Sequence, residues 1–459
     1  MTNVPTNVGI IGGGMLGMTL GLRLAQRGVQ VTIFEGAAAP GGLAAPARVG
    51  GYTWDRFYHV ILLSDTELLG LLQEIGLSDR LRWGVTRTGV YGGGKHYSVS
   101  TTIEYLRFPL LSLVDKARLA ATILHASGIV DGMPLESIPV SDWLIRWSGR
   151  STFERLWLPL LRSKLGENYR IASASFIWAI IARMYRARRS GMKREMFGYV
   201  DGGYDTVLPR LRAHLEAQGV RFRLGEPVEE VRGGEAGATI RTAGGSEEFD
   251  VAVVTLPCAR VARLCPQLAR VERERLGRVV YQGVACASVL LRRPLRGFYV
   301  TNITEEGIPF TAVIEMTALV DRERFGGNSL VYLPRYLAQD DPFWQRTDDE
   351  VRPEFLAGLF RLYPELTGDD VLAFQVNRVR EVLAVATMHY TAQALPPLVT
   401  SVPNLFVVNS AQIANGTLNV NETVALAERQ SRELVDLFEK GRRTGRPVDQ
   451  RTAVSPHVP

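Results

Sequence analysis

The feature that most constrains this chain is a glycine-rich turn near its start. An apolar run at residues 8–11 leads directly into the sequence Gly-Gly-Gly-Met-Leu-Gly, and leucines at helical spacing follow until Gly28. A second apolar run, at residues 29–34, ends at Glu35. The order strand, G-x-G-x-x-G turn, helix and strand within ~30 residues predicts a βαβ unit that binds a dinucleotide. The predicted fold class is therefore α/β, with a Rossmann-type domain at the N-terminal end.

Each residue type in this turn has a physical role. The first glycine permits a tight turn, the second lets the backbone approach a pyrophosphate, and the third allows close packing of helix and strand. The N–H groups at the start of the helix attract phosphate, and the carboxylate of Glu35 can accept both hydroxyls of an adenosine ribose. The motif alone leaves NAD and FAD open. The cofactor contacts that it predicts are Gly12, Gly14, Met15, Leu16, Gly17, Glu35 and Gly36.

The composition is that of a folded globular protein. Of the 459 residues, 46% are hydrophobic and 22% are charged, which excludes a disordered scaffold or a small disulfide framework. The formal net charge of +6 is too small for a chain of this length to indicate nucleic-acid binding. The three cysteines form no CxxC pair, so we expect no metal site and a cytoplasmic location. The start of the chain has no secretory signal pattern, and no apolar run approaches the ~20 residues of a membrane-spanning helix.

Three further segments resemble the superfamily of FAD-dependent amine oxidases, protoporphyrinogen oxidases and phytoene desaturases. Gly41-Gly42-Leu43 is similar to a second glycine pair that passes the flavin in that family. Residues 202–204, 227–231 and 249–257 resemble its return to the FAD domain, and residues 403–424 contain a segment similar to its C-terminal flavin segment. The resemblance implies non-covalent FAD, because the C-terminal segment contains no cysteine. The further FAD contacts that it implies are Gly41, Gly42, Leu43, Val228, Thr255, Asn409, Ser410, Asn419, Val420 and Asn421.

The resemblance also implies two domains built from discontinuous segments. A Rossmann-type FAD-binding domain would use residues 1–80, 200–280 and 385–440. A mixed α+β substrate domain would use residues 81–199 and 281–384, and residues 441–459 would form a disordered tail. The patterns predict a mainly helical stretch at about 65–200. They also predict a strand-rich stretch at 280–385 with a helix near 348–362, and a closing helix at about 422–439.

Two departures from the family pattern bear on the substrate. Many amine oxidases place a lysine near flavin N5 from the later part of the substrate domain, but this chain has no lysine between Lys193 and Lys440. Val420 stands where many members carry one of two aromatic rings that flank the substrate nitrogen. A simple amine oxidase is therefore disfavoured.

Candidate catalytic residues are less strongly indicated, because hydride transfer to a flavin depends more on position than on acid–base groups. His59 follows the second glycine pair and is a candidate acid–base group, with a packed structural histidine as the alternative. Glu315 ends an apolar run, where a carboxylate is costly to bury without a partner. It is either a base or a structural ion-pair partner. The remaining candidates, with structural roles as their alternatives, are Tyr332 and Arg335, beside Tyr336, and His389 with Tyr390.

The predicted function is an FAD-dependent oxidoreductase that transfers a hydride between a C–C or C–N bond of a small organic substrate and flavin N5. Oxygen, a quinone or a protein could reoxidise the flavin. The alternative is an enzyme similar to UDP-galactopyranose mutase, with Arg335, Arg378 and Arg380 as diphosphate ligands. A third class is a flavin-stabilised binding protein without turnover. Residues 176–194 begin with aromatic and apolar side chains and end with basic ones. This pattern suggests peripheral contact with an anionic membrane, and the alternative is a buried helix.

Overall fold

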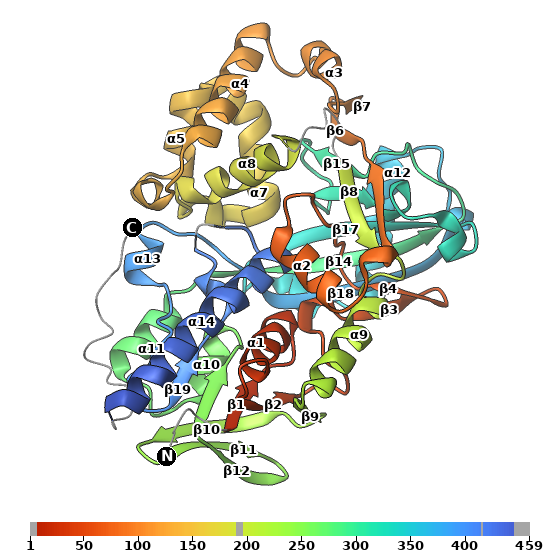
Figure 1. Cartoon of the computed structure of the whole chain (residues 1–459). Helices are drawn as coiled ribbons and strands as arrows, with labels where there is room; N and C mark the ends of the chain where they lie inside the picture. The colour runs from red at the N-terminus through yellow and green to blue at the C-terminus, as the bar shows by residue number, and fades with distance from the viewer. Residues whose placement is uncertain (1–6, 190–195, 415, 445–459) are drawn as a thin grey trace.

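A parallel sheet built from distant parts of the chain forms the base of the molecule. The computed structural model describes residues 7–189, 196–414 and 416–444 (Figure 1). Within these residues, five strands pair in parallel in the order β19, β13, β1, β2, β9. Their bounds are Asn7–Ile11 (β1), Gln30–Glu35 (β2), Arg221–Leu224 (β9), Val251–Val254 (β13) and Leu405–Val407 (β19). This is the Rossmann-type sheet that the glycine motif predicts.

Both faces of this sheet are covered, which explains its apolar strands. Ile10 and Ile33 pack under helices on one face, whereas Ile11 and Phe34 pack on the other face. The helices of the first face are α1 (Met15–Ala25), α2 (Thr66–Glu74), α9 (Tyr204–Ala217) and α14 (Val420–Thr444). The second face is covered by β10 (Val228–Gly234), β11 (Gly237–Thr242), β12 (Gly245–Phe249), α10 (Cys258–Leu264) and α11 (Arg270–Gly277).

A second, mixed sheet lies above the first (Figure 1). In the described part of the chain it has seven strands in the order β18, β14, β17, β16, β15, β6, β7. Its bounds are Thr88–Gly92 (β6), Lys95–Ser98 (β7), Tyr281–Leu291 (β14), Val300–Ile303 (β15), Ala312–Glu315 (β16), Ser329–Leu337 (β17) and Val371–Ala384 (β18). One face packs on α12 (Asp348–Leu362), and the other packs on β3 (Pro46–Val49) and β4 (Tyr52–Asp55).

Part of this sheet differs from the sequence prediction. Residues 81–98, predicted to be mainly helical, form β6, β7 and β5 (Leu81–Val85), and β5 pairs with β8 (Met196–Val200). A glycine turn joins β6 to β7, with φ of +59° at Gly93 and +73° at Gly94. The predicted helix at 348–362 is confirmed as α12, and the closing helix begins slightly earlier than predicted. The division into two domains stays a prediction. Residues 441–444 of the predicted disordered tail instead continue α14, because the helix extends to Thr444, and residues 445–459 lie outside the described residues.

A helical layer covers one end of the second sheet (Figure 1). It contains α3 (Thr102–Arg107), α4 (Leu113–Gly128), α5 (Val140–Ser148), α6 (Arg150–Thr152), α7 (Leu158–Leu165) and α8 (Ala174–Arg189). The aromatic and apolar side chains of α8 are buried in this layer, including Phe176, Ile177 and Trp178. These side chains face the protein interior, which favours the alternative of a buried helix over peripheral membrane contact. Residues 190–195 of the basic end lie outside the described residues. No helix in the described ranges is both long and apolar enough to cross a bilayer.

Candidate functional site

The first glycine turn brings two backbone segments into unusually close contact. At Gly12, φ is +116° and the N–H donates to the carbonyl of Phe34 at 2.8 Å. A Cβ atom on Gly17 would lie 1.9 Å from the carbonyl oxygen of Gly12. Met15 begins α1, and no side chain caps this end of the helix. The N–H groups at the start of α1 therefore have no side chain as a competitor for a bound anion.

The second glycine pair lies directly against the first turn. The N–H of Gly41 donates to the carbonyl of Gly13 at 2.8 Å. A Cβ on Gly42 would lie 3.2 Å from the Cα of Gly14. Leu43 turns toward the neighbouring core. The two glycine segments thus form one surface of bare backbone, although about 25 residues separate them in the chain.

Glu35 closes this backbone surface from β2. One carboxylate oxygen accepts the N–H of Gly13 at 2.8 Å, and the other accepts the N–H of Ala37 at 2.9 Å. The hydroxyl of Thr255 donates to the carbonyl of Ile11 at 2.9 Å, so the end of β13 is tied to the end of β1. A carboxylate held at this point by backbone donors suits the hydroxyls of a ribose.

Two further predicted contacts lie beside Glu35, where the segment before β10 meets the loop after β2. Gly36 is exposed beside Pro227, and Val228 begins β10 with a half-buried side chain. The structure therefore brings the residues predicted from positions 12–43, Val228 and Thr255 to one end of the parallel sheet.

The residues predicted to contact FAD near the C-terminal end of the chain use their side chains in hydrogen bonds to other parts of the protein. Asn409 is fully buried, and its amide donates to the carbonyl of Leu256 at 3.1 Å. Ser410 follows it and begins a short 3₁₀ turn. The side-chain oxygen of Asn421 accepts the N–H of Leu68 at 3.0 Å, which ties the start of α14 to α2.

Asn419 and Val420 form the beginning of α14. The side-chain oxygen of Asn419 accepts the N–H of Glu422 at 3.0 Å, and Val420 packs partly buried on the core below α1. These side chains hold the N-terminal end of α14 in place. A helix start fixed in this way presents a partial positive charge.

Arg56 is a further site residue that was not predicted from the sequence. Its Nη2 donates to the carbonyl of Gly42 at 2.8 Å, and its Nε is buried with no hydrogen-bond partner. No carboxylate among the described residues forms an ion pair with Arg56, and burial lowers the pKa of its guanidinium. A half-buried cation without a counter-charge is unfavourable, so a bound anion would stabilise it. The only sequence signal was its place in the segment that precedes His59.

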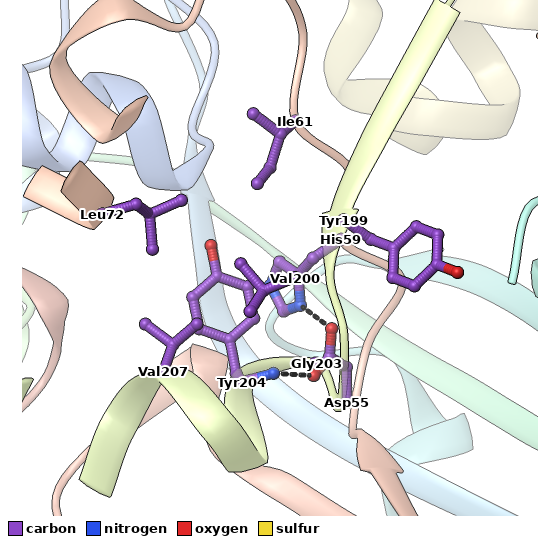
Figure 2. A pocket seen from close by; sticks show the side chains of 9 residues that line it. All are labelled: Asp55, His59, Ile61, Leu72, Tyr199, Val200, Gly203, Tyr204 and Val207. Atoms are coloured by element: carbon purple, nitrogen blue, oxygen red, sulfur yellow. Dashed lines mark hydrogen bonds and ion pairs between the residues drawn. The ribbon is translucent and has the colours of Figure 1, made fainter. Parts of the chain in front are cut away.

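His59 lies in a small buried cavity that Figure 2 shows from close by. Its Nδ1 is 3.6 Å from a carboxylate oxygen of Asp55, whose other oxygen accepts the N–H of Tyr204 at 2.7 Å. The cavity volume is about 10 Å³, which is close to the space of one water molecule. A cavity of this size does not hold an organic substrate. The small cavity favours the alternative of a packed histidine, although the Nδ1 of His59 is buried without a hydrogen-bond partner.

Tyr332 joins the same group from β17. Its side chain is fully buried, and its hydroxyl donates to the backbone carbonyl of Asp55. Burial, and then the negative charge of Asp55, hold the pKa of Tyr332 well above its ordinary value. His59 and Tyr332 thus both converge on Asp55, which sequence reasoning did not single out. The signal that could have found Asp55 is an acid at the end of a short strand beside the second glycine pair.

The other catalytic candidates lie elsewhere. Glu315 is buried, and its two oxygens accept the N–H groups of Leu295 at 2.8 Å and Gly297 at 3.1 Å. Burial raises the pKa of Glu315 against the opposing effect of those two donors. These contacts give Glu315 a structural role, in which it holds the loop that contains Leu295 and Gly297.

Arg335, His389 and Tyr390 do not join the Asp55 group. Arg335 forms an ion pair with Glu354 at 3.4 Å, on the α12 side of the sheet. His389 is exposed, with φ of +53°. Tyr390 is buried and donates to the carbonyl of Ala411 at 2.7 Å. The structure thus separates the candidates that sequence proximity grouped together.

The three arginines predicted as diphosphate ligands in the mutase alternative already interact with neighbouring residues. Arg378 forms an ion pair with Asp348 at 2.6 Å, and Arg380 donates to the carbonyl of Gln339 at 2.8 Å. Arg335 and Arg378 are thus neutralised by carboxylates, whereas Arg380 donates to a carbonyl and forms no ion pair in the described ranges.

Comparison with known proteins identifies the class. The sequence profile of the family described as "Flavin containing amine oxidoreductase" matches residues 17–434. The chain therefore belongs to this family, which confirms the predicted resemblance and the predicted class of flavin-dependent oxidoreductases. The coproporphyrinogen III oxidase of Mycobacterium tuberculosis (strain ATCC 25618 / H37Rv) is 26% identical over 286 residues, which cover 58% of this chain and 62% of that protein. The chain thus matches less than two thirds of the length of its curated relatives.

Solved structures confirm the predicted fold. A putrescine oxidase bound to putrescine is similar with a TM-score of 0.71 and 16% identity, covering 94% of this chain and 99% of that chain. A reduced UDP-galactopyranose mutase is similar with a TM-score of 0.72 and 14% identity, covering 94% and 96%. At sequence identities this low, structural similarity shows that the fold is shared and nothing more. Because both kinds of enzyme share it, the site must decide the activity.

The residues of the glycine surface fit a flavin dinucleotide. Side chains would fill the space beside Gly17 and Gly42, the start of α1 carries no capping side chain, and Glu35 stands at the end of β2. Arg56 adds a positive charge without a carboxylate partner in the described ranges. This set provides close backbone approach, phosphate binding and ribose binding in one place.

Proposed function

We propose that this protein binds FAD non-covalently and oxidises or reduces an organic substrate at a C–C or C–N bond. The observation that carries the proposal is the contact between the two glycine segments at the start of α1, beside Glu35. When bound, FAD supplies a hydride acceptor or donor at its N5 atom. The other steps belong to the chain, whose residues bind the cofactor, orient the substrate and exclude water.

Each predicted contact has a proposed part in holding the cofactor. Glu35 accepts the ribose hydroxyls, the first glycine turn and the start of α1 bind the diphosphate, and Val228 packs beside the adenine. Arg56 adds positive charge next to Gly42. The residues at 409–410 and 419–421 fix the C-terminal segment against β13 and α2, so that the start of α14 faces the flavin end.

His59 and Tyr332 have a proposed positioning role. Both contact Asp55, and Asp55 also holds the start of α9 through the N–H of Tyr204. This group fixes the segment that runs from β4 past Arg56 to His59, between the glycine surface and the second sheet. We therefore expect that substitution of His59 affects how tightly the cofactor is held more than it affects proton transfer.

The proposal specifies the chemical class of the substrate and not an individual compound. The name of the mycobacterial relative makes coproporphyrinogen III the first compound to test. The electron acceptor is oxygen, a quinone or a protein. The three cysteines are buried and unpaired, which supports a location in the reducing cytoplasm.

Purification followed by visible spectroscopy and identification of the released nucleotide tests the proposal. We expect a yellow protein that releases FAD on denaturation, and whose flavin is bleached without oxygen by a substrate such as coproporphyrinogen III. A protein that contains no flavin and rejects added FAD would contradict the proposal. Turnover of UDP-galactopyranose after dithionite reduction, without net redox change, would favour the mutase alternative.

A further inference from the structure

A group of polar side chains gathers where α7 and the following 3₁₀ helix η5 (Gly166–Arg170) pack against β14 and β17. The Nζ atom of Lys164 lies 5.1 Å from the centre of the Tyr336 ring. The hydroxyl of Tyr336 is hydrogen-bonded to that of Tyr58 at 2.8 Å. The side chain of Asn168 donates to the Oε1 of Gln282 at 2.9 Å. These five residues, which we call the Lys164 cluster, come from four separate parts of the chain.

The cluster continues toward the glycine surface. Tyr58 is two residues from Arg56, which donates to the carbonyl of Gly42. Tyr336 and Gln282 lie on neighbouring strands, since Val284, two residues after Gln282, is paired with Tyr336. The Lys164 cluster therefore lies on the side of the second sheet that faces the proposed cofactor site.

The charge of this cluster is positive and uncompensated. Lys164 is half-buried, and it forms no ion pair with any carboxylate in the described ranges. The nearest acid along the chain, Glu167, is already paired with Arg162 and Arg170. Arg56, at the other end of the group, also has no acidic partner among the described residues.

The cluster also has an excess of hydrogen-bond donors. Gln282 is fully buried, and its Nε2 has no hydrogen-bond partner. Lys164 contributes an ammonium group, which can only donate. A buried donor without an acceptor costs free energy. A ligand that brings acceptor oxygens would remove this cost, and its negative charge would be attracted by the unpaired ammonium of Lys164.

We propose that the Lys164 cluster binds a carboxylate group of the substrate. The proposal rests on the proposed function and narrows it, because the substrate is then an organic acid rather than an amine. The ammonium of Lys164 would pair with the carboxylate, and the amide of Gln282 would donate to it. A protonated amine would be repelled by the same groups, which agrees with the absence of an aromatic residue at Val420.

Titration of the FAD-loaded protein with matched ligands tests this proposal. The probes are benzoate, benzamide and benzylamine, and binding is followed by the change in the visible flavin spectrum. We expect benzoate to bind at least about tenfold more tightly than benzamide, and benzylamine to bind more weakly than either. In Lys164→Met this preference for benzoate disappears, whereas Lys164→Arg retains it. The matched control is Lys95→Met, at the exposed first residue of β7, which leaves the preference unchanged.

Three results would overturn the proposal: equal binding of benzoate and benzamide, no spectral response to benzoate, or an unchanged preference in Lys164→Met. A response to phenyl phosphate without one to benzoate would replace the carboxylate with a phosphate and so also contradict it. Thermal unfolding identifies a variant that fails to fold, and Lys164→Gln then takes its place. A protein that binds no FAD would instead contradict the proposed function itself, so the two failures are distinguishable.

Discussion

Gly17 leaves no room for a side chain, and this single position controls the approach of α1 to the end of β1. A Cβ atom there would lie 1.9 Å from the carbonyl oxygen of Gly12, far inside any van der Waals contact. The obstacle is backbone, which cannot rotate away as a side chain would. By contrast, Gly70 on α2 is exposed, and a Cβ atom at that position would meet nothing within 4 Å.

We therefore predict opposite outcomes for the same substitution at these two glycines. Gly17→Ala pushes α1 from the sheet, so we expect loss of bound FAD and a lower unfolding temperature. Gly70→Ala keeps its FAD and gains up to about 1 kcal/mol in the free energy of unfolding, because alanine favours helix over glycine. FAD content by absorbance and thermal unfolding measure both. Normal FAD content in Gly17→Ala would show that the glycine turn does not hold the cofactor.

At the scale of single elements, segments with a clear local sequence pattern were predicted correctly, and segments without one were not. The βαβ unit was predictable because its strands, turn and helix lie within about 30 residues and each carries its own pattern. β6 was not predicted: its short run Thr88–Gly92 carries no clear strand pattern, and although it pairs locally with β7, its other partner β15 (Val300–Ile303) is about 200 residues away. The site shows the same division. Glu35 follows from the motif, whereas Arg56 contacts Gly42 outside any recognisable motif, and Lys164 matters only through its contact with the distant Tyr336.

The 3₁₀ helix η9 (Gly368–Asp370), which leads directly into β18, depends on one carboxylate. Asp370 accepts two hydrogen bonds from Arg293, at 2.9 and 2.8 Å, and one from the N–H of Thr367. The Arg293 guanidinium, followed by the Thr367 N–H, lowers the pKa of Asp370 to about 2. Because the unfolded chain binds this proton more tightly, the carboxylate stabilises the fold above pH ~4, and that contribution is lost as the pH falls toward about 2.

We predict that Asp370→Asn lowers the free energy of unfolding at neutral pH, and that its difference from the wild type shrinks between about pH 5 and pH 3. Urea unfolding at several pH values measures this difference. The neighbouring Asp369 is exposed, so Asp369→Asn is the matched control and is expected to have little effect. A difference that stays constant over this pH range would show that the Asp370 charge does not stabilise η9.

At the scale of the whole molecule, the last helix packs on the first. α14 lies against α1, and Arg23 of α1 pairs with Glu428 of α14 at 2.5 Å and with Glu74 of α2 at 2.8 Å. Phe438, near the end of α14, is 3% exposed, and its ring lies edge-on to Phe406 at 5.9 Å. The glycine turn therefore depends on residues more than 400 positions away.

We predict that Phe438→Ala destabilises the protein by about 3–5 kcal/mol, because it leaves a cavity between α14 and the sheet. FAD should also dissociate more readily, since α14 supports α1. Chemical denaturation and the fraction of flavin lost on dialysis measure the two effects. Glu439→Ala, at the adjacent exposed position, is the control. Wild-type stability in Phe438→Ala would show that α14 does not support the glycine turn.

The order of strands has a consequence for biosynthesis. β19, at the edge of the parallel sheet beside β13, and α14, which covers α1, are the last described elements of the chain. While the ribosome still holds this segment, α1 lacks its cover and the nascent sheet keeps an open edge. Apolar surface on the growing polypeptide is then exposed, which is a state that chaperones recognise. Cofactor loading is therefore expected to wait until β19 and α14 have left the ribosome.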